Sequence, residues 1–470
     1  MFFHQRFIPG LAIASYMVGD EKAKEVAVID PTRDVDEFID MARREGLRIT
    51  HILETHVHAD FVSGSAELKA RLGGTPQVHS SGMGGREWTP PYADHVVKDG
   101  DEISVGSVRL RAIHTPGHTP EHVTWALYDD TRSREVPWLL FTGDFLFVGD
   151  VGRPDLLGEA ARKELAHQLY QSVFGKLPPL PDYTEVFPGH GAGSLCGKAI
   201  GSRRSSTVGY ERRFNPALRE MPESQWTETL LKGMPLAPPY FRRMKKMNAE
   251  GPRLLGHDLP GRQRFTAREI HERLCEHCMV VDVRTKEAFA AAHVPGSINI
   301  PLGPNLPTWA GWVLPYDKKL VIVPASPAEV PEVVTHLIRV GLDDVQGYME
   351  DGIDAWENHG FAIAKLETLS VQELDARLKQ PAARRPFVLD VRTEGEWAAG
   401  HIDGALHVHG GVLKDRFNEV PTDRPVVVIC GSGYRGSIDA SFLKSKGYDN
   451  VSNVLGGMTA WKAAELPAVR

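Results

Sequence analysis

The chain has 470 residues, which at roughly 150 residues per domain predicts about three folding units. Its 54 basic and 61 acidic side chains give a formal net charge of −7, which excludes a general nucleic-acid binder that depends on a basic surplus. The composition, 42% hydrophobic and 24% charged, is typical of soluble globular proteins, and no apolar run approaches the ~20 residues that span a bilayer. Arg6 and Pro9 interrupt the N-terminal segment, so we expect no signal peptide and a cytoplasmic protein that binds neither nucleic acid nor membrane.

In the first half, short apolar or β-branched runs alternate with amphipathic stretches. Strands are predicted at residues 11–19, 25–32, 48–56, 75–81, 107–113, 122–129 and 137–147. Helices are predicted at residues 36–46, 64–74 and 161–177. This alternation favours a layered α/β domain. Residues 232–262 are rich in proline, glycine and basic side chains without a sustained period, which predicts a linker with a short helix in its middle.

The second half contains an internal repeat. Residues 279–300 match residues 387–408 at an offset of 108, which pairs Asp282 with Asp390 and His293 with His401. Each copy is about 105 residues long, the size of a small α/β domain. We therefore expect three domains, at residues 1–245, 246–365 and 366–470.

The histidines and cysteines are unevenly distributed. Eleven of the 20 histidines precede residue 191, which indicates metal chemistry in the first half. The cysteines are too few and too scattered for a disulfide-stapled fold, and they are Cys196, Cys275, Cys278 and Cys430.

Four polar loops follow predicted strands in the first half. They are THVHAD (residues 55–60), HTPGHT (114–119), TGD (142–144) and FPGHG (187–191). Any one of them alone is typical of an ordinary capped loop. All four together, in this order and each at a strand end, indicate imidazoles and carboxylates that converge on a metal ion.

The motifs HVHAD, PGHT, TGD and PGHG resemble those of the metallo-β-lactamase superfamily over about residues 1–230. The resemblance implies an αββα sandwich with metal at one edge between its sheets. The superfamily motif HxHxDH supports two metals, but Phe61 stands at its last position here. Because an apolar ring cannot coordinate a metal, we expect one metal ion.

Within the superfamily, the chain is most similar to the persulfide dioxygenases. That resemblance implies one Fe(II) per chain, with zinc as the alternative, and the ligands His56, His118 and Asp144. Two imidazoles and one carboxylate suit non-haem Fe(II) and leave positions for O2 and substrate. A second set either orients these ligands or binds metal, and it consists of His58, Asp60 and His190.

Two further features lie after His190. Cys196 is either a small buried apolar residue or a catalytic, sulfur-handling thiol. Arg203, Arg204 and Tyr210 belong either to a solvated helix face or to a substrate-binding clamp for an anionic thiol carrier. Glutathione, coenzyme A and bacillithiol have acidic groups that would suit such a clamp.

The second repeat copy places a thiol at a strand end. Cys430 is followed by Gly431, Ser432, Gly433 and Tyr434 and then by a predicted helix, so backbone N–H groups and the helix dipole would stabilise its thiolate. Arg435 adds a positive charge. The loop and the flanking DVR and GHI elements resemble rhodanese over residues 366–470. The resemblance implies that Cys430 is a nucleophile that carries a persulfide within the sulfur-binding loop.

The first copy keeps DVR and DAW but aligns Pro324 with Cys430 and Glu329 with Arg435. Proline has neither a thiol nor an N–H group, so we expect an inactive rhodanese-like domain. Cys275 and Cys278 form a CxxC without a second pair, which we interpret as structural.

The hypothesis that joins these features is a persulfide dioxygenase fused to a sulfurtransferase. It would oxidise a small thiol persulfide with O2 to sulfite, and Cys430 would transfer sulfur to give thiosulfate, as in the multidomain enzymes of bacterial sulfide detoxification. The alternative is a zinc-dependent thioester hydrolase of the glyoxalase II kind, with the rhodanese domains as accessories. A third hypothesis is a sulfur-sensing scaffold. In each case we expect a homo-oligomer.

Overall fold

The computed structural model describes residues 1–274 and 278–470, so Cys275 of the expected structural CxxC lies outside the described residues. The chain forms two compact units, one of residues 1–258 with 338–341 and one of residues 259–337 with 342–470. In the described parts, no helix is both long and apolar enough to cross a membrane.

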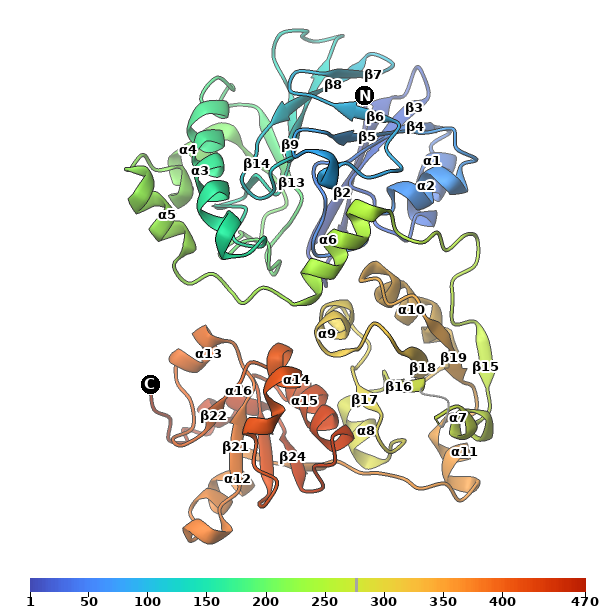
Figure 1. The fold of residues 1–470 in the computed structure, drawn as a ribbon, viewed down its shortest axis with the longest axis vertical. Coiled ribbons are helices and arrows are strands. Elements are labelled where there is room, and N and C mark those ends of the chain that lie inside the picture. The colour runs from blue at the N-terminus through green and yellow to red at the C-terminus, as the bar shows by residue number, and fades with distance from the viewer. Residues whose placement is uncertain (275–277) are drawn as a thin grey trace. The chain divides into compact units, whose positions relative to one another are not determined.

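The first unit contains two six-stranded sheets and a small hairpin (Figure 1). The first sheet has the order β1 (Phe2–Ile8), β2 (Ile13–Asp20), β3 (Glu25–Ile29), β4 (Arg48–Leu53), β5 (Gln77–Ser81), β6 (His95–Val97). The second has the order β14 (Ser206–Thr207), β13 (Glu185–Pro188), β10 (Leu139–Gly143), β9 (Val123–Asp129), β8 (Val108–His114), β7 (Glu102–Val105). The hairpin is β11 (Leu146–Phe147) with β12 (Asp150–Val151).

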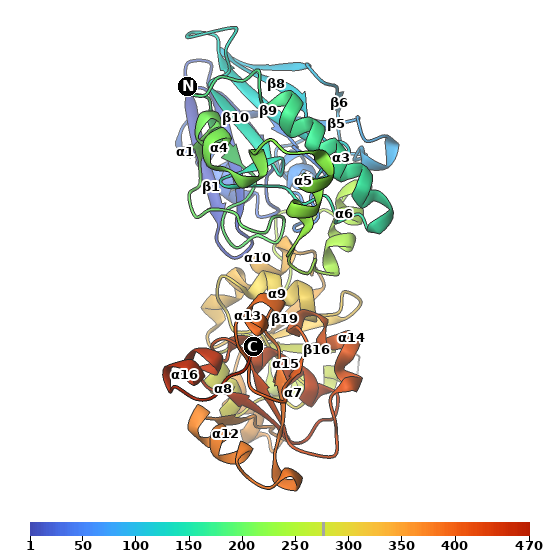
Figure 2. The same cartoon turned by 90° about the vertical axis from the view of Figure 1, so that its left-hand side faces the viewer.

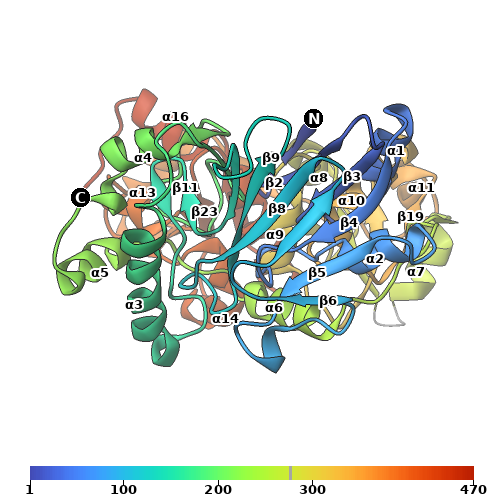
Figure 3. The ribbon, with the colours of Figure 1, turned by 90° about the horizontal axis from the view of Figure 1, so that it is seen from above.

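Alternation along the strands builds the layers. In β9, Trp125 and Leu127 are buried between the sheets, whereas Ala126 and Tyr128 face the outer layer of α3 and α5. The outer helices are α1 (Asp36–Arg44), α2 (Ser65–Arg71), α3 (Glu159–Lys176), α4 (Val208–Phe214), α5 (Glu223–Leu231) and α6 (Tyr240–Glu250). Figure 3 shows α3 along one side of this unit and α1 and α2 along the other, and Figure 2 shows α5 beside α3. These layers confirm the predicted αββα sandwich.

Two predictions for this unit need correction. The run 137–147 is not one strand, because Gly143 has a positive φ of 47° and separates β10 from β11. A side chain at Gly143 would lie 2.7 Å from Thr55 Oγ1, so the bend depends on glycine. The expected linker does contain a helix, but that helix, α6, packs into the first unit, and the expected boundary at residue 245 falls inside it.

The second unit contains two parallel sheets of the same topology, so each copy of the repeat forms an α/β fold. The first copy has strand order β15 (Gln263–Phe265), β19 (Val345–Met349), β18 (Lys319–Val323), β16 (Cys278–Asp282), β17 (Ile298–Asn299). Its helices are α7 (Ala267–Leu274), α8 (Lys286–Ala291), α9 (Leu306–Val313), α10 (Val330–Arg339) and α11 (Gly352–Asn358).

The second copy has strand order β20 (Glu367–Leu369), β24 (Val451–Val454), β23 (Val426–Ile429), β21 (Phe387–Asp390), β22 (Leu406–His407). Its helices are α12 (Val371–Leu378), α13 (Glu394–Ala398), α14 (Leu413–Arg416), α15 (Tyr434–Ser445) and α16 (Gly457–Ala463). The two copies share the same strand register. Val323 of β18 pairs with Asp282 of β16, and Ile429 of β23 pairs with Asp390 of β21. The residues that follow are Pro324 and Cys430.

Candidate functional site

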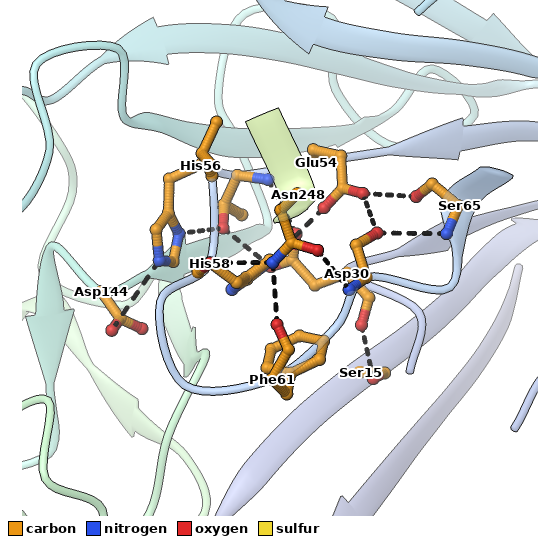
Figure 4. Close-up of polar contacts among 12 residues, drawn as sticks. Ser15, Asp30, Glu54, His56, His58, Phe61, Ser65, Asp144 and Asn248 are labelled. Carbon is orange, nitrogen blue, oxygen red and sulfur yellow. Dashed lines mark hydrogen bonds and ion pairs between the residues drawn. The ribbon is translucent and has the colours of Figure 1, made fainter. Parts of the chain in front are cut away.

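Three side chains from three strand ends meet in the first unit. His56 follows β4, His118 follows β8, and Asp144 lies at the bend between β10 and β11, and one ligand atom of each lies within 4.8 Å of the others. Asp144 Oδ2 is 3.9 Å from His56 Nε2 (Figure 4) and 3.3 Å from His118 Nε2. We call these three residues the HHD set.

The Nε2 atoms of His56 and His118 and both oxygens of Asp144 are buried and have no hydrogen-bond partner among the described residues, although Asp144 Oδ1 lies 3.5 Å from His190 Nε2. Leaving buried polar atoms unpaired costs about 1–3 kcal/mol each unless a ligand satisfies them. Two nitrogens and a carboxylate are a suitable donor set for a transition metal. The residues therefore fit the implied metal ion.

The opposite nitrogen of each imidazole is held by the protein. His56 Nδ1 lies 2.9 Å from Thr55 Oγ1, which donates at 2.8 Å to Asp30, so His56 Nδ1–H donates in turn. His118 Nδ1–H donates to the Arg153 carbonyl at 3.0 Å. Both bonds leave the Nε2 lone pair available to a metal.

Electrostatics favour the ligand form of the HHD set. Burial, together with the neighbouring imidazoles, lowers the pKa of His56 well below its ordinary value, so the ring is neutral. For Asp144, burial acts to raise the pKa, but the surrounding histidines, His190 and His118 foremost, leave the pKa below its ordinary value. Neutral imidazoles and an ionised carboxylate are the states that bind a cation.

The ring of His58 lies next to that of His56, with ring centroids 4.2 Å apart, but its Nε2 faces two carboxylates. Its Nε2 is 3.2 Å from Asp30 and 3.4 Å from Glu54, and its ring packs on Phe61 with ring centroids 4.4 Å apart. Burial acts to lower the pKa of His58, but the two carboxylates raise it well above its ordinary value. The structure thus places His58 in an ion-paired group with Asp30 and Glu54.

Asp60, His190 and Cys196 form a further group whose ligand atoms lie within 4.8 Å of one another. His190 Nε2 is 3.4 Å from Asp60 and 3.5 Å from Asp144 Oδ1, so Asp144 lies between this group and the HHD set. Cys196 is fully buried, and burial with the nearby carboxylates of Asp144 and Asp60 raises the pKa of its thiol well above the ordinary value. Cys196, which is only six residues from His190 in the sequence, thus lies beside it in the structure.

None of the three residues of the expected substrate clamp, Arg203, Arg204 and Tyr210, lines the cavity beside His118. Arg204 stacks over Phe7, with its guanidinium carbon 4.4 Å from the ring centroid, and Arg203 is exposed. Tyr210 is 55% exposed and contacts Phe214. The residues that line this cavity include Phe241, Arg242 and Lys245 of α6.

Several buried residues near the HHD set carry no motif of their own. His122 Nε2 accepts a hydrogen bond from the Asp144 backbone at 3.0 Å, and Glu121 accepts one from Val57 N–H at 2.7 Å. Burial raises the pKa of Glu121 to about 7. Glu121 and His122 lie two and three residues after the HTPGHT motif, and that closeness in sequence is the one signal that could have identified them.

The second unit holds Cys430 at the end of β23. The thiol is buried, and its Sγ accepts a hydrogen bond of 3.0 Å from the backbone N–H of Gly433. Gly433 has a φ of +91° and caps α15, so the loop residues 431–434 turn directly into the helix. Arg435 makes a bidentate ion pair with Glu396, at 2.7 and 2.6 Å.

Residues of the first copy form hydrogen bonds with the helix that follows this loop, α15. Asn299 Oδ1 accepts from Ser437 Oγ at 2.6 Å, and the Asn299 N–H donates to Ser441 Oγ at 3.0 Å. Tyr434 donates to the Pro301 carbonyl at 3.3 Å. The copy that lacks the thiol therefore holds the helix that follows the thiol of its neighbour.

Known proteins match both units. The family descriptions "Metallo-beta-lactamase superfamily" and "Rhodanese-like domain" match residues 8–190 and residues 266–359 and 370–464. The bovine and human proteins named persulfide dioxygenase ETHE1, mitochondrial, are each 33% identical over 215 residues, 46% of this chain and 74% of theirs. A probable metallo-hydrolase of Burkholderia pseudomallei is 32% identical over 248 residues, 46% of this chain and 79% of its own.

A crystal structure titled metallo-beta-lactamase from Staphylococcus aureus is 37% identical and covers 74% of this chain and 99% of its own, with a TM-score of 0.65. The match extends beyond the first unit, because that unit accounts for little more than half of the chain. Together with the strand-end motifs, these likenesses confirm the resemblances seen in the sequence. The chain belongs to the metallo-β-lactamase superfamily, among the relatives of the ETHE1 persulfide dioxygenases, and two rhodanese-like domains follow that domain in the sequence.

Proposed function

We propose that this protein oxidises low-molecular-weight thiol persulfides with O2 and transfers sulfane sulfur through Cys430. The observation that carries the proposal is the HHD set, whose facing atoms are buried and unpaired and match a two-histidine, one-carboxylate iron site. The relatives named persulfide dioxygenase support it. We further propose a cytoplasmic enzyme with one Fe(II) per chain.

The overall chemistry balances in three steps. Loading follows Cys430–S⁻ + RSSH → Cys430–S–S⁻ + RSH, in which the sulfane sulfur of a second persulfide bonds to the thiolate as its bond to the RSH sulfur breaks. Oxidation follows RSSH + O2 + H2O → RSH + SO3²⁻ + 2 H⁺, in which the terminal sulfur is oxidised and O2 is reduced. Transfer follows Cys430–S–S⁻ + SO3²⁻ → Cys430–S⁻ + S2O3²⁻, in which one S–S bond breaks and another forms. Bound Fe(II) would supply open coordination positions for the persulfide sulfur and O2.

The chain's own residues have separate tasks in these steps. His56, His118 and Asp144 would hold the metal, and the bonds from Thr55 and the Arg153 carbonyl fix the two imidazole rings. In the second unit, the Gly433 N–H donates to Sγ, which stabilises negative charge on the thiolate leaving group of Cys430.

The test uses the full chain reconstituted anaerobically with Fe(II). Glutathione persulfide should cause O2 uptake with one sulfite formed per O2, and His118→Ala should abolish both. The matched control is His167→Ala, on the exposed face of α3, where the ring bonds Glu223. Absence of O2 uptake by the Fe(II) protein with glutathione, coenzyme A and bacillithiol persulfides would overturn the proposal.

The thioester hydrolase stays an alternative because of one observation. Asp60, His190 and Cys196 lie on the other side of Asp144 from the two ligand histidines and offer a second set of donor atoms. A dizinc hydrolase needs two such sets, whereas the proposed dioxygenase needs one. Two zinc ions per chain, with hydrolysis of S-lactoylglutathione and no O2 uptake, would favour the hydrolase.

A further inference from the structure

Helix α6 is attached to the loop that carries His56. The side chain of Asn248, 1% exposed, donates from Nδ2 to the carbonyls of His58 and Phe61, both at 2.8 Å. Its Oδ1 accepts from the Ser63 N–H at 2.9 Å. Figure 4 shows Asn248 placed against the backbone of this loop. Three bonds from one buried amide fix α6 beside the HHD set.

Two cavities are lined by residues of α6. The inner one, of about 100 Å³, reaches His118 and Thr119 and has apolar walls from Val57, Leu156, Leu157 and Phe241. Arg242 and Lys245 also line this inner cavity. The same two residues also line a wider groove of about 640 Å³. Because the two cavities share Arg242 and Lys245, a basic groove adjoins a small cavity that reaches the candidate metal ligand His118.

The groove has an excess of positive charge. Its cations are Arg86, Arg242, Lys245 and Lys246, against the two carboxylates Glu87 and Glu250. One carboxylate is already engaged, because Glu250 lies 3.7 Å from Lys246. An anionic ligand would be drawn to this groove and would be held by the remaining cations.

Lys245 lines both cavities. Its Nζ lies 3.6 Å over the Trp88 ring, and Trp88 is 3% exposed, which keeps the ammonium group at this position. Burial lowers the pKa of Lys245, and Glu121 and Glu87 partly oppose that effect. A partly desolvated cation of this kind gains from an added anionic partner.

We propose that Arg242 and Lys245 bind the acidic groups of a thiol persulfide whose terminal sulfur points through the inner cavity toward the HHD set. The inner cavity is too small for more than the thioalkyl stem, so charged groups must lie in the groove. The two residues then select persulfides that carry carboxylates or phosphates over neutral ones. This inference rests on the proposed dioxygenase function and moves the expected clamp from Arg203, Arg204 and Tyr210 to α6.

The test compares the Fe(II) form of the full chain with its double variant Arg242→Gln/Lys245→Gln. The KM for O2-dependent oxidation of glutathione persulfide should rise about tenfold or more, while kcat stays close to that of the parent chain. The persulfide of 2-mercaptoethanol, which has no acidic group, should show the same KM with both proteins. Added salt should raise the glutathione persulfide KM of the parent chain more than that of the variant.

The control is Arg243→Gln, which removes one positive charge from an exposed neighbour that lines neither cavity. Calorimetric titration with S-methylglutathione and with coenzyme A gives a readout independent of turnover. Tighter binding of S-methylglutathione, lost in the double variant, would assign the groove to carboxylates. Tighter binding of coenzyme A would assign it to phosphates.

The outcomes separate the two proposals. If the parent chain consumes no O2 with any persulfide, the proposed function fails, whatever the titrations show. If it consumes O2 but the double variant keeps the parent KM and Kd, the groove assignment is wrong. A KM increase in Arg203→Gln/Arg204→Gln that exceeds the increase in the α6 variant would likewise overturn it.

Discussion

The two rhodanese-like copies share a buried framework. Each has an aspartate at the end of its DVR strand that pairs at 2.6 Å with the arginine two residues on, Asp282 with Arg284 and Asp390 with Arg392. In each, a histidine stacks on an aromatic ring, with ring centroids 3.7 Å apart for His293 on Phe289 and 3.5 Å apart for His401 on Trp397. These contacts recur whether or not the copy has a thiol, so they belong to the fold.

The copies differ at the positions that surround the thiol. Cys430 corresponds to Pro324, and the ion pair of Arg435 with Glu396 has no counterpart, because Glu329 and Ala288 occupy the equivalent positions. The first copy lacks both members of this ion pair. This is expected if the ion pair stabilises the loop around the thiol and is not needed for the shared fold. The comparison teaches that fold and sulfur chemistry are separable in this domain.

The sharpest test of this separation is Cys430→Ser. Because the hydroxyl cannot carry a persulfide at neutral pH, thiosulfate formation should fall by about a thousandfold or more, while O2 uptake by the first unit continues. Sulfite should accumulate instead, and both products can be measured by chromatography of their bimane derivatives. Cys278→Ser is the matched control for loss of a thiol. Retained transfer in Cys430→Ser would contradict the assignment.

The converse substitution, Pro324→Cys, tests the other copy. It restores a thiol at the strand end but neither Arg435 nor the glycine-containing loop, so we expect no gain in thiosulfate formation in a Cys430→Ser background.

The framework should respond equally in both copies. Asp390→Asn leaves Arg392 buried without its charged partner, which should lower the free energy of unfolding by about 3–5 kcal/mol. Asp282→Asn should do the same through Arg284. Urea unfolding followed by circular dichroism measures both. A large loss in the second copy and none in the first would show that the pair is specific to the active copy.

Local patterns predicted the order of elements, the repeat and the strand-end motifs, because each depends on residues close together in the chain. The alternation in β9 and the loops that hold His56, His118 and Asp144 are examples. The break after Gly143 was missed because the run 137–147 is continuously apolar, and only its positive φ separates two strands.

Contacts between distant segments could not be predicted in this way. Asn248 bonds the loop of Phe61 across 187 residues, and Asn299 bonds Ser437 across 138. Neither asparagine lies in a motif with a fixed spacing. For the same reason, the basic stretch predicted as a linker is the helix α6, whose residues Arg242 and Lys245 line the cavity beside His118.

A smaller effect should come from the contact between the copies. Asn299→Ala leaves the buried hydroxyl of Ser437 without its acceptor and removes the amide donor to the carbonyls of Asp282 and Arg284, which should cost about 1–3 kcal/mol of unfolding free energy. Cys430 and its N–H donor are untouched, so sulfur transfer should persist in the folded protein. The control is His407→Ala, at the equivalent position of the second copy. An unchanged unfolding midpoint in Asn299→Ala would show that the contact contributes nothing.

The smallest effect concerns the ion pair that the first copy lacks. Burial acts to raise the pKa of Glu396, but the bonds from Arg435 and from the Thr393 backbone lower it to about 2. A carboxylate with a lowered pKa stabilises the fold above its ordinary pKa, and that contribution is lost as the pH falls through the folded-state value. The window is therefore about pH 4.5 to 2. Because Glu396 is partly exposed, we expect about 1 kcal/mol at most.

Glu396→Gln removes this contribution, so its unfolding free energy should fall less between pH 7 and pH 3 than that of the parent chain. Urea unfolding at the two pH values measures the difference, with Glu394→Gln, an exposed residue in the same turn, as the control. Equal pH dependence in the parent chain and in Glu396→Gln would mean that Arg435 gains nothing from the pair. In that case the first copy lost no stability by having Ala288 and Glu329 at these positions, and the pair would have to act on the thiol alone.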